Sequence, residues 1–280
     1  MSDKKHQVFV IGVDGKPLTP TNWRKAKKLM KNYIVSSILI ILYSIIFSTA
    51  IYSENKSNLS PMELYKPIYW IFGSSNDQTK LNISFKYSIT KQYRTGLFFG
   101  YSQLSKWNLY EPSAPFYDNN YNPEIFIKSK YFLNKYIDYI QFAPYEHRSN
   151  GKNENDSRSL NRTYLQLQTS YRILISGKVV VHGINLKGFI YYNEDEPYSE
   201  YDKHYEAKLF TSLGVGENAK EEIYIKFSGF TKGYFETGFI SRKFWFMNPR
   251  IYVQMFNGYN EIMLDYNKKE TAVRIGITFK

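Results

Sequence analysis

A chain of 280 residues is long enough for one large domain or two small ones, and its 18% aromatic content favours β-strands, whose pleated surface suits large rings. The absence of cysteine excludes a disulfide framework and a thiolate metal site. The net charge of +12 would allow nucleic-acid binding, but residues 1–32 hold half of it and the rest is spread without a basic helix, so we expect no nucleic-acid partner.

The N-terminal part carries the one long apolar run, residues 33–52. Met30 and Lys31 supply a positively charged start, and the small residues Ser48 and Ala50 stand at the −3 and −1 positions of a cleavage site. We therefore expect a cleaved signal peptide at residues 30–50, with a retained membrane anchor as the alternative. Because a signal peptide does not normally begin thirty residues in, residues 1–29 are interpreted as an upstream extension.

Residues 51–80 include a segment, 60–72, that does not behave as a strand. The segment contains Pro61 and Pro67, and proline lacks the N–H that a strand donates to its neighbour. We expect this stretch to be an N-terminal periplasmic arm.

Residues 81–280 show short alternating runs divided by polar turns. In 81–89 the odd positions are apolar and the even positions polar, a period of two that places each set on one face of a strand. In 162–172, Leu165 and Leu167 fall on one face and Arg162, Gln166 and similar residues on the other. The further candidate strands are 96–103, 124–131, 136–146, 178–191, 206–215, 221–230, 231–241, 243–247 with 250–256, 261–267 and 271–279.

This pattern predicts an all-β fold, a transmembrane antiparallel β-barrel of about 12 strands. Barrel strands cross a bilayer in roughly 9–11 residues, and a closed sheet leaves no unpaired edge in hydrocarbon. The polar face would line the lumen and the apolar face would meet outer-membrane lipids. A soluble β-sandwich also alternates, but the expected signal peptide favours the barrel.

Chemistry is concentrated between His147 and Asn161. His147 and Ser149 are two residues apart on a strand and therefore share a face, which makes a minimal pair of base and nucleophile. A third group must hold the imidazole in its reactive tautomer, and Asn161 begins the next strand, where it could lie across the ladder. The alternative reading of Asn161 is an amide among the lipid headgroups.

These residues are similar to those of the outer-membrane phospholipase A family, a group of twelve-stranded barrels. The likeness lies in His-x-Ser-Asn-Gly followed by Ser-Arg-Ser-x-Asn-Arg, with the family's spacing from histidine to asparagine. It extends over roughly residues 61–280 through further stretches in the same order, 99–103, 113–116, 120–126, 258–261 and 265–267.

The resemblance implies calcium-dependent hydrolysis of phospholipid acyl esters, with Ser149 as nucleophile, His147 as general base and Asn161 as its orienting partner. The amide of Gly151 would complete the oxyanion hole. The family's Ca²⁺ site maps onto the carbonyl of Lys152, the hydroxyl of Ser157 and the carbonyl of Ser113 from a second subunit, all oxygen ligands that suit a hard cation. Glu154 is the candidate for a second calcium position.

Gln103 points to a homodimer. It lies on the apolar face of its strand, where an amide is costly alone and adhesive when paired with another polar group. The family likewise places a glutamine at the subunit contact, which implies an enzyme that is active as a dimer. Two other functions stay open from the residues alone: a non-catalytic outer-membrane barrel (channel or scaffold) and a soluble lipid-binding β protein.

Overall fold

The computed structural model describes residues 7–8, 21–22, 61–73, 79–90, 95–130, 137–202, 204–215, 218–229, 231–244 and 249–279. Two compact units, residues 1–55 and 56–280, divide the chain. In the first, β1 (Gln7–Val8) pairs antiparallel with β2 (Thr21–Asn22). The signal peptide expected at 30–50 lies outside the described residues, and it stays a prediction together with the interpretation of residues 1–29 as an extension.

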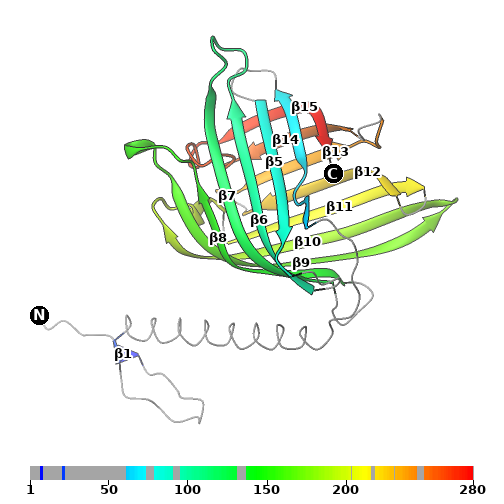
Figure 1. Ribbon diagram of the computed structural model, residues 1–280, viewed down its shortest axis with the longest axis horizontal. Coiled ribbons are helices and arrows are strands. Elements are labelled where there is room, and N and C mark those ends of the chain that lie inside the picture. The colour runs from blue at the N-terminus through cyan, green and yellow to red at the C-terminus, as the bar shows by residue number, and fades with distance from the viewer. Residues whose placement is uncertain are drawn as a thin grey trace, which may run out of the picture. The chain divides into compact units, whose positions relative to one another are not determined.

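The second unit is a closed antiparallel barrel of 12 strands, as expected (Figure 1). Each strand pairs with the next in the chain, and β4 closes the ring between β15 and β5. The strands are β4 (Ile68–Gly73), β5 (Thr79–Ser88), β6 (Thr95–Trp107), β7 (Phe116–Ser129), β8 (Ile137–Ser149), β9 (Ser159–Ile175), β10 (Lys178–Glu194), β11 (Tyr205–Val215), β12 (Asn218–Ser228), β13 (Tyr234–Ile240), β14 (Arg250–Gly258) and β15 (Glu270–Phe279).

The alternation predicted from the sequence is present in the strands. On β5, Asn82 and Ser84 are buried inside while Ile83 and Tyr87 are exposed outside. The same division runs round the ring, so the exposed large side chains of the strands are mostly apolar, which suits contact with hydrocarbon. Among the described residues, no helix has the length and apolar character needed to cross a membrane.

The barrel interior is polar and filled with paired charges. Arg274 is enclosed and donates to both carboxylate oxygens of Glu261, which also accepts from Lys80. Arg162 donates to Glu146 at 2.6 Å in a second buried pair. A buried charge is costly unless it is paired. These contacts therefore pair the charged side chains that fill the lumen.

The prediction of a non-strand arm over residues 51–80 is wrong where the structure describes that stretch. β3 (Met62–Leu64) and β4 both pair with β5, and a break at Pro67 separates them. Side chains of β5 replace the missing ladder bonds: the amide of Asn82 donates to the Pro67 carbonyl, and the Ser84 hydroxyl accepts from the Lys66 N–H. The prolines therefore interrupt a barrel strand without removing it.

Residues 261–267 form a loop and not the predicted strand. The short apolar run 262–264 suggested a strand, but Ile262 and Met263 are buried within a loop. The strand expected at 243–247 is also absent from residues 243–244, while the rest of that range lies outside the described residues.

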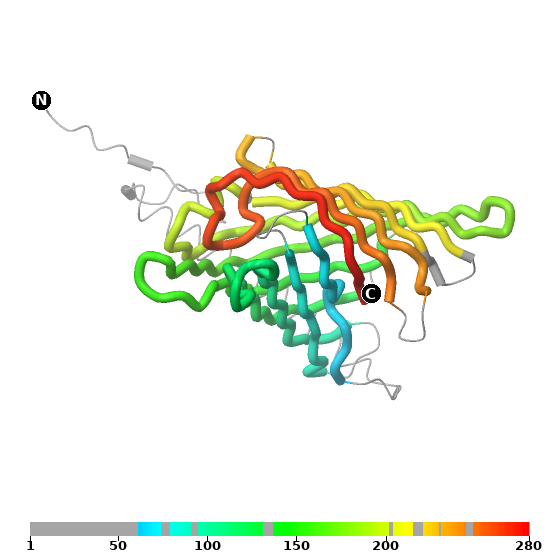
Figure 2. The backbone as a smooth tube through the Cα atoms, turned by 90° about the horizontal axis from the view of Figure 1, so that it is seen from above, coloured from blue at the N-terminus to red at the C-terminus, as the bar shows by residue number. Residues whose placement is uncertain are grey.

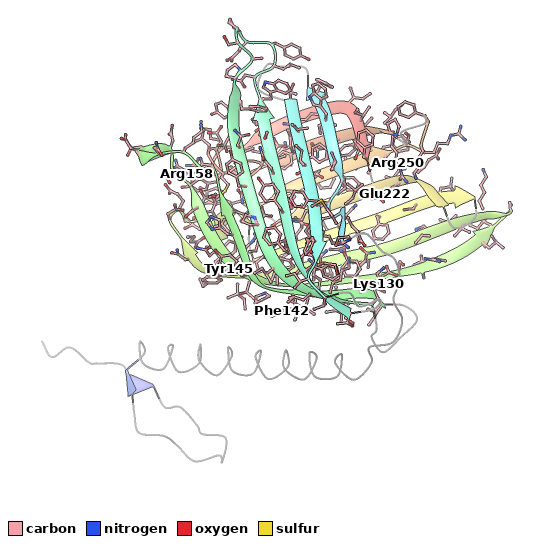
Figure 3. All side chains as sticks on the ribbon, viewed as in Figure 1. Lys130, Phe142, Tyr145, Arg158, Glu222 and Arg250 are labelled. Carbon is pink, nitrogen blue, oxygen red and sulfur yellow. The ribbon has the colours of Figure 1, made fainter. Side chains whose placement is uncertain are left out.

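The β8–β9 turn and the β14–β15 loop mark one end of the barrel. Figure 2 shows the green β8–β9 turn and the red β14–β15 loop at the same end. Figure 3 labels Arg158 in the β8–β9 turn and Lys130 after β7, at opposite ends of the ring. The Lys130 end also carries the two-residue turn of Ser176 and Gly177 between β9 and β10, and such short turns are typical of the periplasmic side of exported barrels.

Candidate active site

The β8–β9 hairpin brings the predicted base and its orienting partner together. His147 and Asn161 are directly opposite in the ladder, and the imidazole Nδ1 lies 2.9 Å from the Asn161 Oδ1. Since an amide oxygen accepts, the ring donates its Nδ1–H, and Nε2 keeps its lone pair. A neutral imidazole in this tautomer can accept a proton at Nε2.

Ser149 occupies the same outward face of β8 as His147. The buried Glu146 identifies the lumen side of this strand. His147 and Ser149 stand one and three residues after it, so both face away from the lumen. Ser149 pairs with Tyr121 on β7 and with Ser159 on β9. The structure therefore brings His147, Ser149 and Asn161 to one patch on the outer surface, at the end of the hairpin.

The turn after Ser149 has a backbone that depends on glycine. Gly151 has φ +65°, a left-handed conformation that residues with a Cβ rarely adopt. A Cβ there would also stand 3.0 Å from the Tyr121 ring. Both the backbone conformation and the lack of space for a Cβ therefore favour glycine at the position predicted to supply the oxyanion-hole amide.

Asn150 organises this turn, and the sequence reading did not single it out. Its side chain is buried, with 3% of the residue exposed. Its Oδ1 accepts from the N–H groups of Lys152 and Arg158, and its Nδ2 donates to the Asp156 carbonyl at 2.8 Å. One amide therefore ties the two arms of the turn together. The run Asn-Gly after a strand signals a turn, but nothing in it shows that the asparagine side chain is turned inward.

A second set of contacts joins the turn to β7 and the β14–β15 loop. Asn150 Nδ2 also lies 3.4 Å from Asp118 Oδ1, and Asp118 Oδ2 accepts from the Leu264 N–H. Asn120 accepts from the Met263 N–H at 2.9 Å. The backbone amides of Met263 and Leu264 lie far from β7 in the sequence, so local sequence patterns could not predict these hydrogen bonds.

Aromatic side chains pack behind the hairpin on its lumen side. Leu160 is fully enclosed in a cluster with Tyr198, Met263 and Tyr266. Burial and the hydrogen bond to the Glu196 carboxylate raise the pKa of Tyr266 to about 12, so the phenol stays protonated as a donor. Burial likewise raises the pKa of Tyr198.

The residues expected to bind calcium lie in exposed turns that offer oxygen atoms. Lys152 and Ser157 both belong to residues 150–158, termed here the Asn150 turn. The Lys152 amine donates to the Tyr117 carbonyl at 2.9 Å and so points away from the proposed calcium position. Glu154 is exposed in the same turn, with φ +52°. Among the described residues, no group of three His, Cys, Asp or Glu side chains is placed to hold a metal ion. The carbonyl and hydroxyl oxygens of this turn, with the Glu154 carboxylate, are oxygen donors of the kind that fits a hard cation.

Ser113 is not part of this turn. It is exposed in the β6–β7 connection and has φ +65°. The connection is pinned by the Trp107 indole, which donates to the Ala114 carbonyl at 2.7 Å. An exposed carbonyl on a fixed turn is suited to a ligand or a second chain.

Gln103 lies on the outer face of β6, as its parity predicts. Its amide oxygen accepts from the Tyr101 hydroxyl and its amide nitrogen donates to Ser105, both on the same strand. Ser105 in turn donates to Asn119 on β7. These four side chains form a polar stripe on a face that otherwise meets lipid.

Comparison with known sequences gives one consistent family. A family model described as Phospholipase A1 matches residues 22–279. The chain is 30% identical over 218 residues to a protein of Neisseria meningitidis serogroup B assigned as a phospholipase A1, covering 72% of this chain and 54% of that protein. It is 26% identical over 220 residues to the phospholipase A1 of Escherichia coli K12, covering 74% of this chain and 71% of the relative. The chain thus spans about half the length of the Neisseria protein.

Solved structures match the fold. Outer membrane phospholipase A from Escherichia coli superposes with a TM-score of 0.63 at 22% identity, covering 78% of this chain and 94% of that one. The outer membrane phospholipase dimer of Salmonella typhi with bound calcium gives a TM-score of 0.65 at 21% identity, covering 80% and 94%.

Proposed function

Because this chain belongs to the phospholipase A1 family, we propose that it hydrolyses phospholipid acyl esters in the outer membrane and depends on calcium. The observation that carries the proposal is the hydrogen bond of His147 to Asn161 on the outward face that also holds Ser149. Relatives named phospholipase A1 and the twelve-stranded barrel support the same activity. Substrate would reach this patch directly from the surrounding lipid.

His147 is the proposed proton carrier. With its Nδ1–H donated to Asn161, the imidazole can take the Ser149 hydroxyl proton at Nε2 while the Ser149 oxygen attacks the ester carbonyl. The same proton then passes to the leaving lysophospholipid oxygen. Asn161 holds the ring but, being neutral, stabilises the imidazolium less than an aspartate would. Water completes the cycle by releasing the fatty acid from Ser149.

The amide of Gly151 is the proposed oxyanion donor, since this glycine, with its left-handed backbone, stands two residues after the nucleophile. Calcium, when bound, would polarise the ester carbonyl and stabilise its developing negative charge. The residues that would hold it are Lys152 through its carbonyl, Ser157 through its hydroxyl and Ser113 through a carbonyl contributed by the other subunit. Glu154 is the candidate for a second position.

A homodimer follows from the same assignment, because Ser113 and the Asn150 turn would belong to different subunits. The polar stripe that contains Gln103 supports β6 as the contact, since amides on a lipid-facing surface gain most by pairing. If this is correct, calcium should promote both crosslinked dimer and activity with one midpoint. Full activity in a protein that stays monomeric would contradict the shared site.

The nucleophile is tested with a matched pair of serines. Ser149 and Ser159 are opposite each other across the β8–β9 ladder, so they differ little in depth and surroundings. Fatty-acid release from phospholipid with calcium should be lost in Ser149→Ala and kept within a few-fold in Ser159→Ala. Unchanged release in a folded Ser149→Ala protein would reject Ser149 as the nucleophile, whereas no release by the wild-type protein would favour a non-catalytic barrel.

A further inference from the structure

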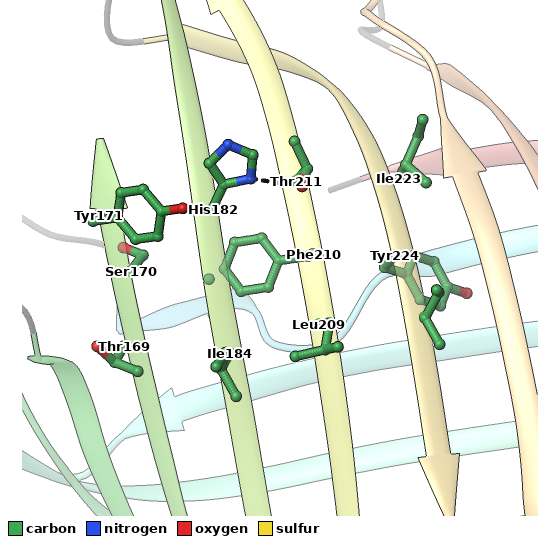
Figure 4. A pocket seen from close by; sticks show the side chains of 12 residues that line it. Thr169, Ser170, Tyr171, His182, Ile184, Leu209, Phe210, Thr211, Ile223 and Tyr224 are labelled. Carbon is green, nitrogen blue, oxygen red and sulfur yellow. Dashed lines mark hydrogen bonds between the residues drawn. The ribbon is translucent and has the colours of Figure 1, made fainter. Parts of the chain in front are cut away.

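A groove of about 380 Å³ lies on the outside of the barrel, remote from His147 (Figure 4). It crosses β9 to β12, and its outward side chains form two rows joined by ladder pairing. One row runs Tyr171, His182, Thr211 and Ile223; the other runs Thr169, Ile184, Leu209 and Ile225.

Tyr171, His182 and Thr211, termed here the polar row, form a connected set. The His182 Nδ1 lies 2.9 Å from the Thr211 hydroxyl oxygen, and the His182 and Tyr171 rings are 5.2 Å apart between centroids. One ladder step toward the β9–β10 turn, the outward residues are Ile173, Val180 and Leu213. The polar row is therefore enclosed by apolar surface on both sides.

Polar groups on a lipid-facing surface are expensive unless something polar meets them. His182 and Thr211 satisfy one another through a single bond, which leaves the second imidazole nitrogen and the half-exposed Tyr171 side chain directed outward. These two neighbouring groups, the second imidazole nitrogen and the Tyr171 phenol, lie at one height on the barrel and favour a polar ligand at that height.

The height of the polar row across the membrane follows from the length of β9. Ten residues separate Asn161 from Tyr171 along β9. At about 3.3 Å per residue and a tilt of about 40°, they span ~25 Å across the membrane, which is roughly the height of the apolar band of such barrels. With Asn161 among the outer-leaflet headgroups, Tyr171 reaches the headgroups of the inner leaflet. Glu221, opposite Leu213, places a carboxylate in the otherwise apolar row one ladder step beyond.

We propose that this groove binds one phospholipid of the inner leaflet, with its phosphate at the polar row and an acyl chain along Ile184, Leu209 and Ile225. When the Thr211 hydroxyl donates to His182 Nδ1, the ring carries its N–H at Nε2, and this N–H and the Tyr171 phenol are donors that match phosphate oxygens. The apolar row lies on the midplane side, where an acyl chain from a headgroup at this height must run. The proposal rests on the outer-membrane location proposed above, but not on any catalytic residue.

Binding is measured by native mass spectrometry of the purified barrel in detergent, using a phosphatidylglycerol with ether-linked chains that the proposed ester hydrolysis cannot consume. One lipid should bind tightly to the wild type, and His182→Leu and Thr211→Val should each weaken it at least about tenfold. Thr237→Val on β13 is the matched control, because Thr237 is an outward threonine outside the groove and should leave binding unchanged. Leucine and valine suit a lipid-facing surface, so folding is expected to survive.

Three outcomes would overturn the proposal: equal binding in the His182 and Thr211 variants, equal binding of an ether-linked diacylglycerol that lacks phosphate, or displacement by lipid A, which would indicate an outer-leaflet source. The depth is checked with Ile223→Trp in vesicles containing brominated phospholipids. Bromine near the glycerol should quench its fluorescence most, and strongest quenching by bromine near the chain ends would also refute the inner-leaflet level. Fatty-acid release should be unaffected in His182→Leu. A failed lipid-binding result would therefore be distinguishable from a failure of the proposed hydrolysis.

Discussion

Replacing Asn150 with alanine should disorder the turn that carries Gly151 and the proposed calcium ligands without changing any reacting group. The substitution removes two accepted hydrogen bonds, from Lys152 and Arg158, and two donated ones, including that to the Asp156 carbonyl. A typical bond of this kind contributes about 1 kcal/mol net, and water can replace part of it in an exposed turn. We expect a local loss of ~2–3 kcal/mol.

Because 1.4 kcal/mol corresponds to a factor of ten, that loss should raise the calcium concentration for half-maximal fatty-acid release by roughly 30- to 140-fold. The assay is release from phospholipid as a function of calcium. Asn155→Ala is the control, since Asn155 is exposed in the same turn and its backbone carbonyl, which accepts from Arg158, is retained. An Asn150→Ala protein with the wild-type calcium midpoint and rate would refute the role given to this side chain.

Three further outcomes are expected. Asn161→Ala should lower the rate by roughly 10²-fold in a barrel that stays folded, because His147 loses its fixed tautomer; a rate within two-fold of wild type would contradict this. Gly151→Ala should cost about 1 kcal/mol or more and lower activity, since the turn needs φ +65° and meets Tyr121; circular dichroism melting and release assays check both. Burial opposes the charge of Glu261, but its lysine and arginine partners outweigh that and lower the pKa of its carboxyl, so its stabilising effect is full above about pH 4.5 and is lost as pH falls; Glu261→Gln should flatten that acid sensitivity of melting.

The sequence predicted those features that depend on local pattern. Alternation in 81–89 and 162–172 marked the two faces of the barrel correctly, because side chains on a strand alternate whatever the tertiary setting. The contact of His147 with Asn161 was also foreseeable, since the two residues flank one hairpin turn.

Features that depend on tertiary contacts were missed. Pro67 suggested an arm because its N–H is absent, but Asn82 and Ser84 of a neighbouring strand supply the bonds instead. Residues 261–267 contain a short apolar run that suggested a strand, yet bonds from their backbone to Asp118 and Asn120 hold them as a loop. In each case the deciding partner lies far away in the chain.

Calcium-dependent hydrolysis is the central claim, and it is tested by fatty-acid release from phospholipid by the purified wild-type protein in calcium and in excess chelator. The account predicts release in calcium, its loss in chelator and its return when calcium is added back. Release at the same rate in chelator would contradict the claim.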